Sequence, residues 1–315
     1  MKSVHMVDRW CIAAIAVLGL CMSAFATPVW VFDEPFTNDV PSAGWLIQGF
    51  TNGASAGDEG GVPLTGGQML GTPGVPNGFI RFTTPDGGYQ RASAVYTTDW
   101  VWSQNWTMEA EFNCEAGADG VAFSCIGIDN GVLTSNTTYK ALGGSGGFMG
   151  VPRANTAFST NGCGSYSGIS GYSLQFDTYQ NYFGGGKEAA DTNYALVRCR
   201  NLLSWTDVPG STSNFFGNPD FFASKGWVKF RLVQAASGAN GVFTFYWGTN
   251  YENSYTFTKN EIGPAYPALF GTSAGCGGFM ATHDVRNFRV FGEIVPEPGT
   301  ALVVLALAAL IRRRN

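Results

Sequence analysis

Short stretches of alternating apolar and polar residues follow one another through most of this chain, with glycine-rich segments between them. Residues 106–112 alternate in this way, and residues 227–233 and 242–247 flank the glycine-containing segment 237–241. Alternation is typical of strands buried on one face, and a short glycine-rich connection predicts a hairpin. Residues 27–292 show no sustained helical periodicity, so the sequence predicts an all-β sandwich of two packed antiparallel sheets.

The composition agrees with one large β domain. Glycine occurs 43 times among 315 residues, 14% of the residues are aromatic and only 13% are charged, whereas about 25% charged residues is usual in soluble domains. Antiparallel β domains can reach about 250 residues as single units. The formal net charge is −5, and residues 27–311 contain no basic run that could follow a phosphate backbone. We therefore expect no nucleic-acid partner.

The first 26 residues have the features of an export signal. Lys2 and Arg9 precede an apolar run over residues 11–22, and residues 23–26 supply small side chains for a cleavage site. Cleavage after Ala26 predicts a signal peptide of residues 1–26 and an exported protein. An N-terminal membrane anchor is the alternative, although the apolar run is short for a span.

Five cysteines would remain after cleavage, namely Cys114, Cys125, Cys163, Cys199 and Cys276. Outside the cytosol they can form one or two disulfides, with at least one cysteine left over if all pairs are internal, and the sequence does not assign the pairs. No Cys-x-x-Cys spacing occurs, and His283 is the only histidine left. Zinc is therefore poorly provided for, and we expect His283 to be a structural residue at a strand end.

The C-terminal residues 293–315 form a separate unit. Val295-Pro296-Glu297-Pro298-Gly299 ends any strand, residues 301–311 are wholly apolar, and three arginines follow. Eleven helical residues would span about 17 Å, well short of a bilayer core of about 30 Å. The order resembles the bacterial PEP-CTERM sorting signal. The resemblance implies an exosortase-type processing enzyme, transient contact with the inner membrane through the C-terminal helix, and delivery to the cell surface or extracellular matrix. A plain tail anchor is the alternative.

The stretch of residues 174–181 ends in polar or aromatic side chains at every second position. Asp177, Tyr179 and Asn181 are spaced by two, which points their side chains to one face of an extended chain. Calcium takes carboxylate, amide and backbone carbonyl oxygens as ligands, so the spacing allows a calcium corner. Asp and Asn also end ordinary strands as turn formers, which is the alternative.

Three further motifs accompany this stretch. The four motifs in order are Ala118-Asp119-Gly120-Val121-Ala122-Phe123, the glycine run of residues 143–148, residues 176–181, and Gly271-Thr272-Ser273-Ala274-Gly275 before His283. In this order they resemble the L-type, legume-like lectins, which include plant seed lectins and animal secretory-pathway cargo lectins. The likeness covers about residues 29–292. It implies a concanavalin A-like jelly-roll sandwich over residues 27–292, with a sugar site beside bound calcium.

The resemblance implies a role for each site residue. Asp119 would accept hydrogen bonds from sugar hydroxyls, and Gly143 or Gly144 would bring a backbone N–H close to the sugar. Asn181 would bind both calcium and sugar. Tyr179 would offer its carbonyl to calcium and its ring to the C–H face of the sugar. The alternatives are that Asp119 is a turn residue and that the glycine run is a surface loop without ligand contact.

The implied calcium ligands are Asp177, Tyr179, Asn181 and Asp191. Asp191 lies ten residues after Asn181, across three glycines, and Glu188 is its substitute. In the two-metal plant lectins a Glu stands in the place of Gln175 and a His in the place of Tyr194, and both bind a transition ion. Gln and Tyr are poor ligands for such an ion, so we expect Ca²⁺ but no Mn²⁺.

The function predicted from these features is calcium-dependent binding of glycans or exopolysaccharide by an exported, surface or matrix-associated protein that is not an enzyme. A structural matrix or biofilm protein with a non-binding sandwich is the first alternative. A glycoside hydrolase is the second, because related sandwiches include glucanases with an E-x-D-x-x-E strand. The nearest run, residues 109–115, lacks the central Asp and the required spacing.

Overall fold

A computed structural model describes much of the chain. The described residues are 28–36, 44–51, 62–64, 78–85, 88–101, 105–115, 117, 119–127, 143–144, 146–151, 170–179, 182–183, 186–187, 195–202, 204–211, 213–216, 226–237, 240–251, 253–259 and 268–293. The expected signal peptide and, apart from Glu293, the expected sorting signal lie outside them. No helix among the described residues is long and apolar enough to cross a membrane.

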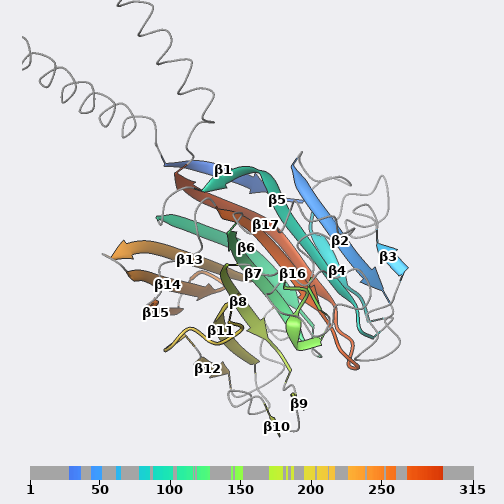
Figure 1. The fold of residues 1–315 in the computed structure, drawn as a ribbon. Helices are drawn as coiled ribbons and strands as arrows, with labels where there is room; N and C mark the ends of the chain where they lie inside the picture. Colours follow the sequence, from blue (N-terminus) through green and yellow to red (C-terminus); the bar gives the residue numbers. More distant parts are fainter. Residues whose placement is uncertain are drawn as a thin grey trace, which may run out of the picture.

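Two antiparallel sheets make up the domain, as the alternation predicted (Figure 1). The back sheet has seven strands in the order β1-β17-β6-β13-β14-β15, with β4 also beside β17. Its strands are β1 (Pro28–Glu34), β4 (Ile80–Thr83), β6 (Trp106–Cys114), β13 (Val228–Ser237), β14 (Asn240–Gly248), β15 (Asn253–Lys259) and β17 (His283–Glu293).

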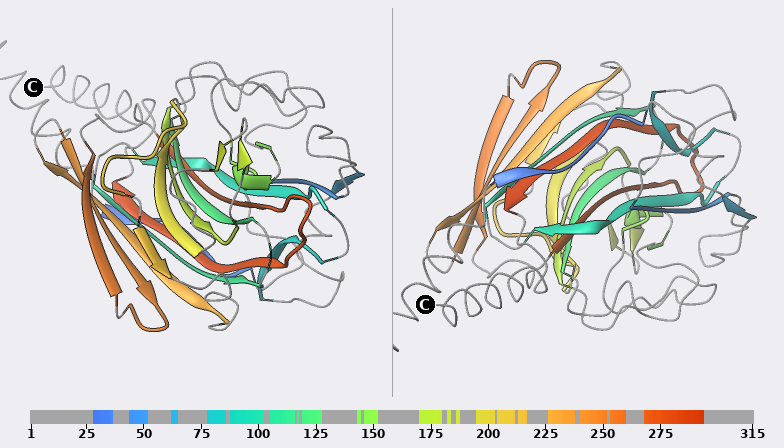
Figure 2. Two further views of the ribbon diagram at one scale, coloured as in Figure 1. Left: turned by 90° about the horizontal axis from the view of Figure 1, so that it is seen from below. Right: turned by 90° about the horizontal axis from the view of Figure 1, so that it is seen from above.

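The front sheet has eight strands in the order β12-β11-β8-β7-β16-β5-β2-β3. Its strands are β2 (Trp45–Thr51), β3 (Val62–Leu64), β5 (Arg91–Val101), β7 (Gly120–Gly127), β8 (Gly171–Asp177), β11 (Ala195–Asn201), β12 (Ser213–Phe216) and β16 (Ala268–Gly275). A small hairpin of β9 (Tyr182–Phe183) and β10 (Gly186–Lys187) and one 3-10 helix, η1 (Gly146–Phe148), complete the described elements. The two sheets lie face to face as separate layers (Figure 2).

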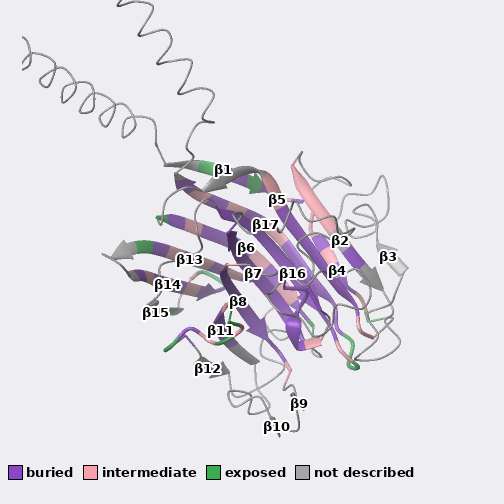
Figure 3. Cartoon of the chain, in the orientation of Figure 1, coloured by how far each residue is buried: buried purple, intermediate pink, exposed green. Residues whose placement is uncertain are grey.

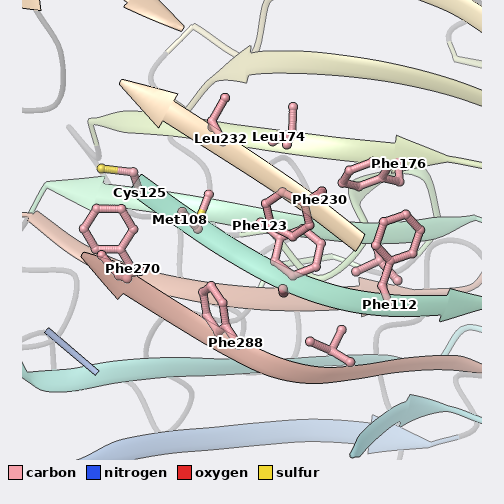
Figure 4. Close-up of a cluster of buried hydrophobic side chains, with 14 of the residues drawn as sticks. Met108, Phe112, Phe123, Cys125, Leu174, Phe176, Phe230, Leu232, Phe270 and Phe288 are labelled. Carbon is pink, nitrogen blue, oxygen red and sulfur yellow. The ribbon is translucent and has the colours of Figure 1, made fainter. Parts of the chain in front are cut away.

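The core between the sheets is built largely from phenylalanine rings (Figure 4). Phe123 and Phe176 come from the front sheet and meet Phe112, Phe230 and Phe288 of the back sheet. The ring centroids are 4.1 Å apart for Phe123 and Phe230 and 4.2 Å apart for Phe112 and Phe176. Such aromatic contacts contribute stability beyond the area they bury, so this cluster holds the two sheets together.

The central strands of the front sheet are buried at every position. This holds for β7, β8 and β16 (Figure 3). Their inner side chains join the core, and their outer face is covered by a second apolar cluster that includes Met149, Val151 and Leu202. A loop therefore lies over the outer face of the front sheet, and the ends of β7, β8 and β16 meet beneath it.

Candidate functional site

The four sequence motifs meet at one end of the front sheet, where backbone hydrogen bonds link them. The Asp119 N–H donates to the Gly275 carbonyl at 3.0 Å, and the Thr178 N–H donates to the Asp119 carbonyl at 2.7 Å. The Gly146 N–H donates to the Cys276 carbonyl at 3.2 Å. Residues 117–120, 143–150, 177–179 and 275–280, as far as they are described, are called the loop cluster below.

Asp119 lies at the centre of the loop cluster and is only 1% exposed. Its Oδ2 atom is 3.3 Å from the point where a Cβ on Gly277 would lie, and 3.8 Å from the corresponding point on Gly146. Two loops thus bring their bare backbone up to one carboxylate. Gly146 also has a φ of +64°, a conformation that side-chain-bearing residues rarely adopt. The glycines are therefore what allows the two loops to close around Asp119.

The glycine run folds back on itself over the front sheet. The Gly143 N–H donates to the Gly150 carbonyl, and the Gly150 N–H donates to the Gly144 carbonyl, each at 2.8 Å. Both Gly143 and Gly144 are buried. The Gly143 N–H is thus used inside the loop, and the expected backbone contact of Gly143 or Gly144 to a ligand stays a prediction.

An aromatic pair, half-buried Tyr179 and exposed Phe279, lies beside these loops. The rings of Tyr179 and Phe279 have centroids 5.2 Å apart and planes inclined by 36°. Phe279 is 62% exposed, and its neighbour Met280 is 44% exposed. Exposed apolar side chains that gather beside polar groups often mark binding surfaces. Sequence reasoning missed Phe279, and the available signal was an apolar pair directly after the two glycines at positions 277 and 278.

The carboxylate of Asp177 is paired with an arginine. The Arg198 Nη2 donates to Asp177 Oδ2 at 2.5 Å, and its Nε donates to Gln175 Oε1 at 3.0 Å. The other carboxylate oxygen, Oδ1, accepts the Tyr179 N–H at 3.1 Å. Arg198 lies directly opposite Gln175 in the β8–β11 register. The residue beside Gln175 is thus Arg198, while Tyr194, which the resemblance aligns with the metal-binding histidine of the two-metal plant lectins, lies outside the described residues.

This pairing determines whether a metal ion fits at Asp177. A divalent ion and a guanidinium about 4 Å apart repel by about 8 kcal/mol at an effective dielectric constant of about 20. The described residues contain no group of three or more His, Cys, Asp or Glu side chains that could hold a metal. Asn181 and Asp191, the other expected side-chain ligands, lie outside the described residues. The described groups at Asp177, a guanidinium on the carboxylate and no second acidic ligand, thus do not favour a divalent ion, and the expected calcium site with Asn181 and Asp191 stays a prediction.

His283 and the described cysteines lie in the interior of the domain. Cys114, Cys125, Cys199 and Cys276 are buried thiols. The Thr83 hydroxyl donates to the Ala281 carbonyl at 2.6 Å, so His283 Nδ1, also 2.6 Å from that hydroxyl, must carry the proton between them. His283 Nε2 has no partner among the described residues. Burial of the ring lowers the pKa of His283 from 6.5 to about 3. His283 is thus a neutral structural residue.

The low pKa of His283 predicts a loss of stability in mild acid. Between its ordinary pKa and about 3, the unfolded chain binds a proton that the folded chain does not, so the free energy of unfolding falls as the pH falls. Lowering the pH from about 7.5 to about 4.5 should reduce the free energy of unfolding by about 2.5 kcal/mol through this histidine. His283→Gln should lack that loss, which urea titrations of both proteins at the two pH values can measure. Equal losses of unfolding free energy in both proteins would contradict the lowered pKa of His283.

The same fold is found in plant lectins. The lectin from Bauhinia forficata, solved in complex with GalNAc, matches with a TM-score of 0.54 and 12% identity over 84% of this chain and 98% of that chain. Lectin I-B4 from Griffonia simplicifolia, in its metal-free form, matches with a TM-score of 0.53 and 15% identity over 84% of this chain and 98% of that lectin. The Lotus tetragonolobus seed lectin matches with a TM-score of 0.52 and 14% identity over 86% of this chain and 100% of that lectin.

These likenesses identify the architecture of the domain. No family model matches the sequence, and no curated protein matches it. The chain has the concanavalin A-like β-sandwich of the legume lectins, which confirms the predicted fold. At 12–15% identity the likeness concerns the fold alone, because one fold can carry many functions.

Proposed function

We propose that this protein binds carbohydrate at the loop cluster and does not process it. The observation that carries the proposal is the junction of the four motifs around Asp119, beside the Tyr179–Phe279 pair. A sugar presents hydroxyl groups on its edges and C–H groups on its faces. The Asp119 carboxylate suits the hydroxyl groups as an acceptor, and an exposed aromatic ring suits the apolar face. Because Asp119 is 1% exposed, the loops of Gly146 and Gly277 have to move apart for a sugar to reach the carboxylate.

Ion pairing of the back-sheet carboxylates supports binding without catalysis. Glu109 and Glu111 begin the run that comes nearest to a glucanase motif, and both lie on β6 of the back sheet. Glu109 pairs with Arg231 and Arg289, and Glu111 pairs with Arg286 at 2.7 Å. Glycoside hydrolysis needs one carboxylate as an acid and another as a nucleophile or base. Carboxylates held by arginines are poorly suited to either role.

The proposal includes the export route expected from the termini. The signal peptide of residues 1–26 would direct the chain out of the cytoplasm, and the sorting signal of residues 293–315 would be processed by an exosortase-type enzyme. The ligand is then a glycan or exopolysaccharide at the cell surface or in the matrix. Calcium dependence, which the sequence predicted, stays a prediction, and no step of the proposal depends on a metal ion.

Asp119→Asn should abolish most sugar binding while leaving the fold intact. The substitution keeps the shape of the side chain but removes the charge that makes its hydrogen bonds to hydroxyl groups strong. We expect affinity to fall about 100-fold, the loss of two such bonds. The measurement uses agarose columns carrying galactose, N-acetylgalactosamine, mannose, glucose or fucose, followed by surface plasmon resonance on the sugar that retains the protein. The melting temperature reports folding.

Two further variants test whether the effect belongs to the site. Phe279→Ala removes an exposed ring, so we expect about tenfold weaker binding at an unchanged melting temperature. Asp207→Asn is the matched control, because Asp207 pairs with Arg200 at 3.1 Å and lies outside the loop cluster. A folded protein that no column retains would favour the structural-scaffold alternative. Equal binding by the Asp119 and Asp207 variants would place the site elsewhere.

A further inference from the structure

Asp177 ends β8, and it and the next two residues, Thr178 and Tyr179, each contact a different group. Asp177 is bound by Arg198, the Thr178 N–H donates to the Asp119 carbonyl, and the Tyr179 ring contacts Phe279. The Asp177 carboxylate also accepts the Tyr179 N–H, which closes the turn. Whatever holds the Asp177 carboxylate therefore sets the positions of both Asp119 and the aromatic pair.

We propose that Arg198 is a permanent cation built into the fold, which holds the 177–179 turn in its binding conformation and replaces a divalent ion at Asp177. The proposal rests on the proposed carbohydrate-binding function and names a positioning residue for it. The side chains of Arg198 and Asp177 are 0% and 1% exposed, so neither water nor salt screens the pair. The cation is supplied by the chain and is present whenever the protein is folded.

The chemistry of the guanidinium suits this role. Its planar fork donates to Gln175 and Asp177 at the same time, and these are two successive outward side chains of β8. Gln175 is a neutral acceptor, so the arrangement holds one cation and one anion. A divalent ion needs several oxygen ligands, usually with more than one carboxylate, and would have to displace the guanidinium. The internal ion pair thus explains why position 175 needs no second carboxylate.

The first test compares the protein with and without divalent ions. The wild-type protein is treated with EDTA, applied to the five sugar columns, and melted with and without added calcium chloride. We expect column retention to stay within twofold and the melting temperature to stay within about 1 °C, because no ion binds the native state at Asp177. Loss of retention in EDTA that calcium restores, or a calcium-dependent rise in melting temperature that Asp177→Asn removes, would overturn the proposal.

The second test uses variants of the arginine. Arg198→Gln removes the cation and should weaken sugar binding at least tenfold, whereas Arg198→Lys keeps the charge and should restore it to within fivefold of wild type. Arg200→Gln is the matched control, because Arg200 is a buried arginine on the same strand that pairs with Asp207. It should bind like wild type. Equal binding by Arg198→Gln and wild type would overturn the proposal.

The two tests separate this inference from the proposed function. If Arg198→Gln does not fold, the lysine variant and the EDTA comparison still decide the question. If no column retains the wild-type protein, the carbohydrate proposal fails. The role of Arg198 is then tested by the effect of calcium on the melting temperature alone. Retention that survives EDTA and follows the charge at position 198 supports both proposals.

Discussion

Gly120→Ala should cost more than about 4 kcal/mol of the free energy of unfolding, enough to prevent stable folding in a marginal domain. A Cβ on Gly120 would lie 2.0 Å from the carbonyl oxygen of Phe176, and the residue has a φ of +149°. The obstacle is the backbone of β8, whose Phe176 side chain is fully buried in the core and cannot shift. Urea unfolding followed by circular dichroism measures the loss.

Gly210→Ala is the control for this prediction. Gly210 also has a positive φ, +76°, but a Cβ added there would meet no atom within 4 Å apart from those of its own chain neighbours. Its cost should be the backbone strain alone, about 1 to 2 kcal/mol. Similar losses for the two variants would contradict the close approach of β7 and β8 at Gly120. Because Gly120 follows Asp119 directly, any folded Gly120→Ala protein should also bind sugar more weakly.

The architecture could be predicted because it depends on short-range patterns. The alternation of residues 106–112 reappears in the burial of β6, where only Glu109 departs from it by being buried as well, and the glycine-containing segment 237–241 joins β13 to β14 in register. Strand and hairpin signals of this kind need only neighbouring residues. The order of the strands in each sheet required the structure, because it joins segments as distant as β1 and β17.

The candidate site was predictable in its motifs and not in its contacts. The four motifs do meet, but the partner of Asp177 is Arg198 of β11, 21 residues further along the chain, and its identity depends on the register between β8 and β11. A one-residue change in register moves a side chain to the opposite face, so spacing alone could not select Arg198. The exposure of Phe279 likewise depends on how a glycine-rich loop folds over its neighbours.

Phe123→Ala should lower the free energy of unfolding by about 3 to 5 kcal/mol, the usual cost of removing a buried phenylalanine. Phe123 is fully buried, and its ring centroid lies 4.1 Å from that of Phe230, 5.8 Å from that of Phe288 and 5.9 Å from that of Phe176. Its removal leaves a cavity between the two sheets that the rings around it cannot fill. Thermal and urea unfolding measure the loss, which corresponds to about 10 °C in melting temperature.

Two companion variants connect the size of this loss to the interior packing. Phe123→Leu refills part of the cavity and should cost clearly less than alanine. Trp30→Ala removes a larger ring that is 48% exposed and contacts Phe291 at 5.4 Å between centroids, so it should cost no more than about 1 kcal/mol. Equal losses for Phe123→Ala and Trp30→Ala would contradict a core centred on Phe123. Because Phe123 points away from the loop cluster, the folded fraction of Phe123→Ala should bind sugar with wild-type affinity, which separates the stability of the sandwich from the chemistry of its site.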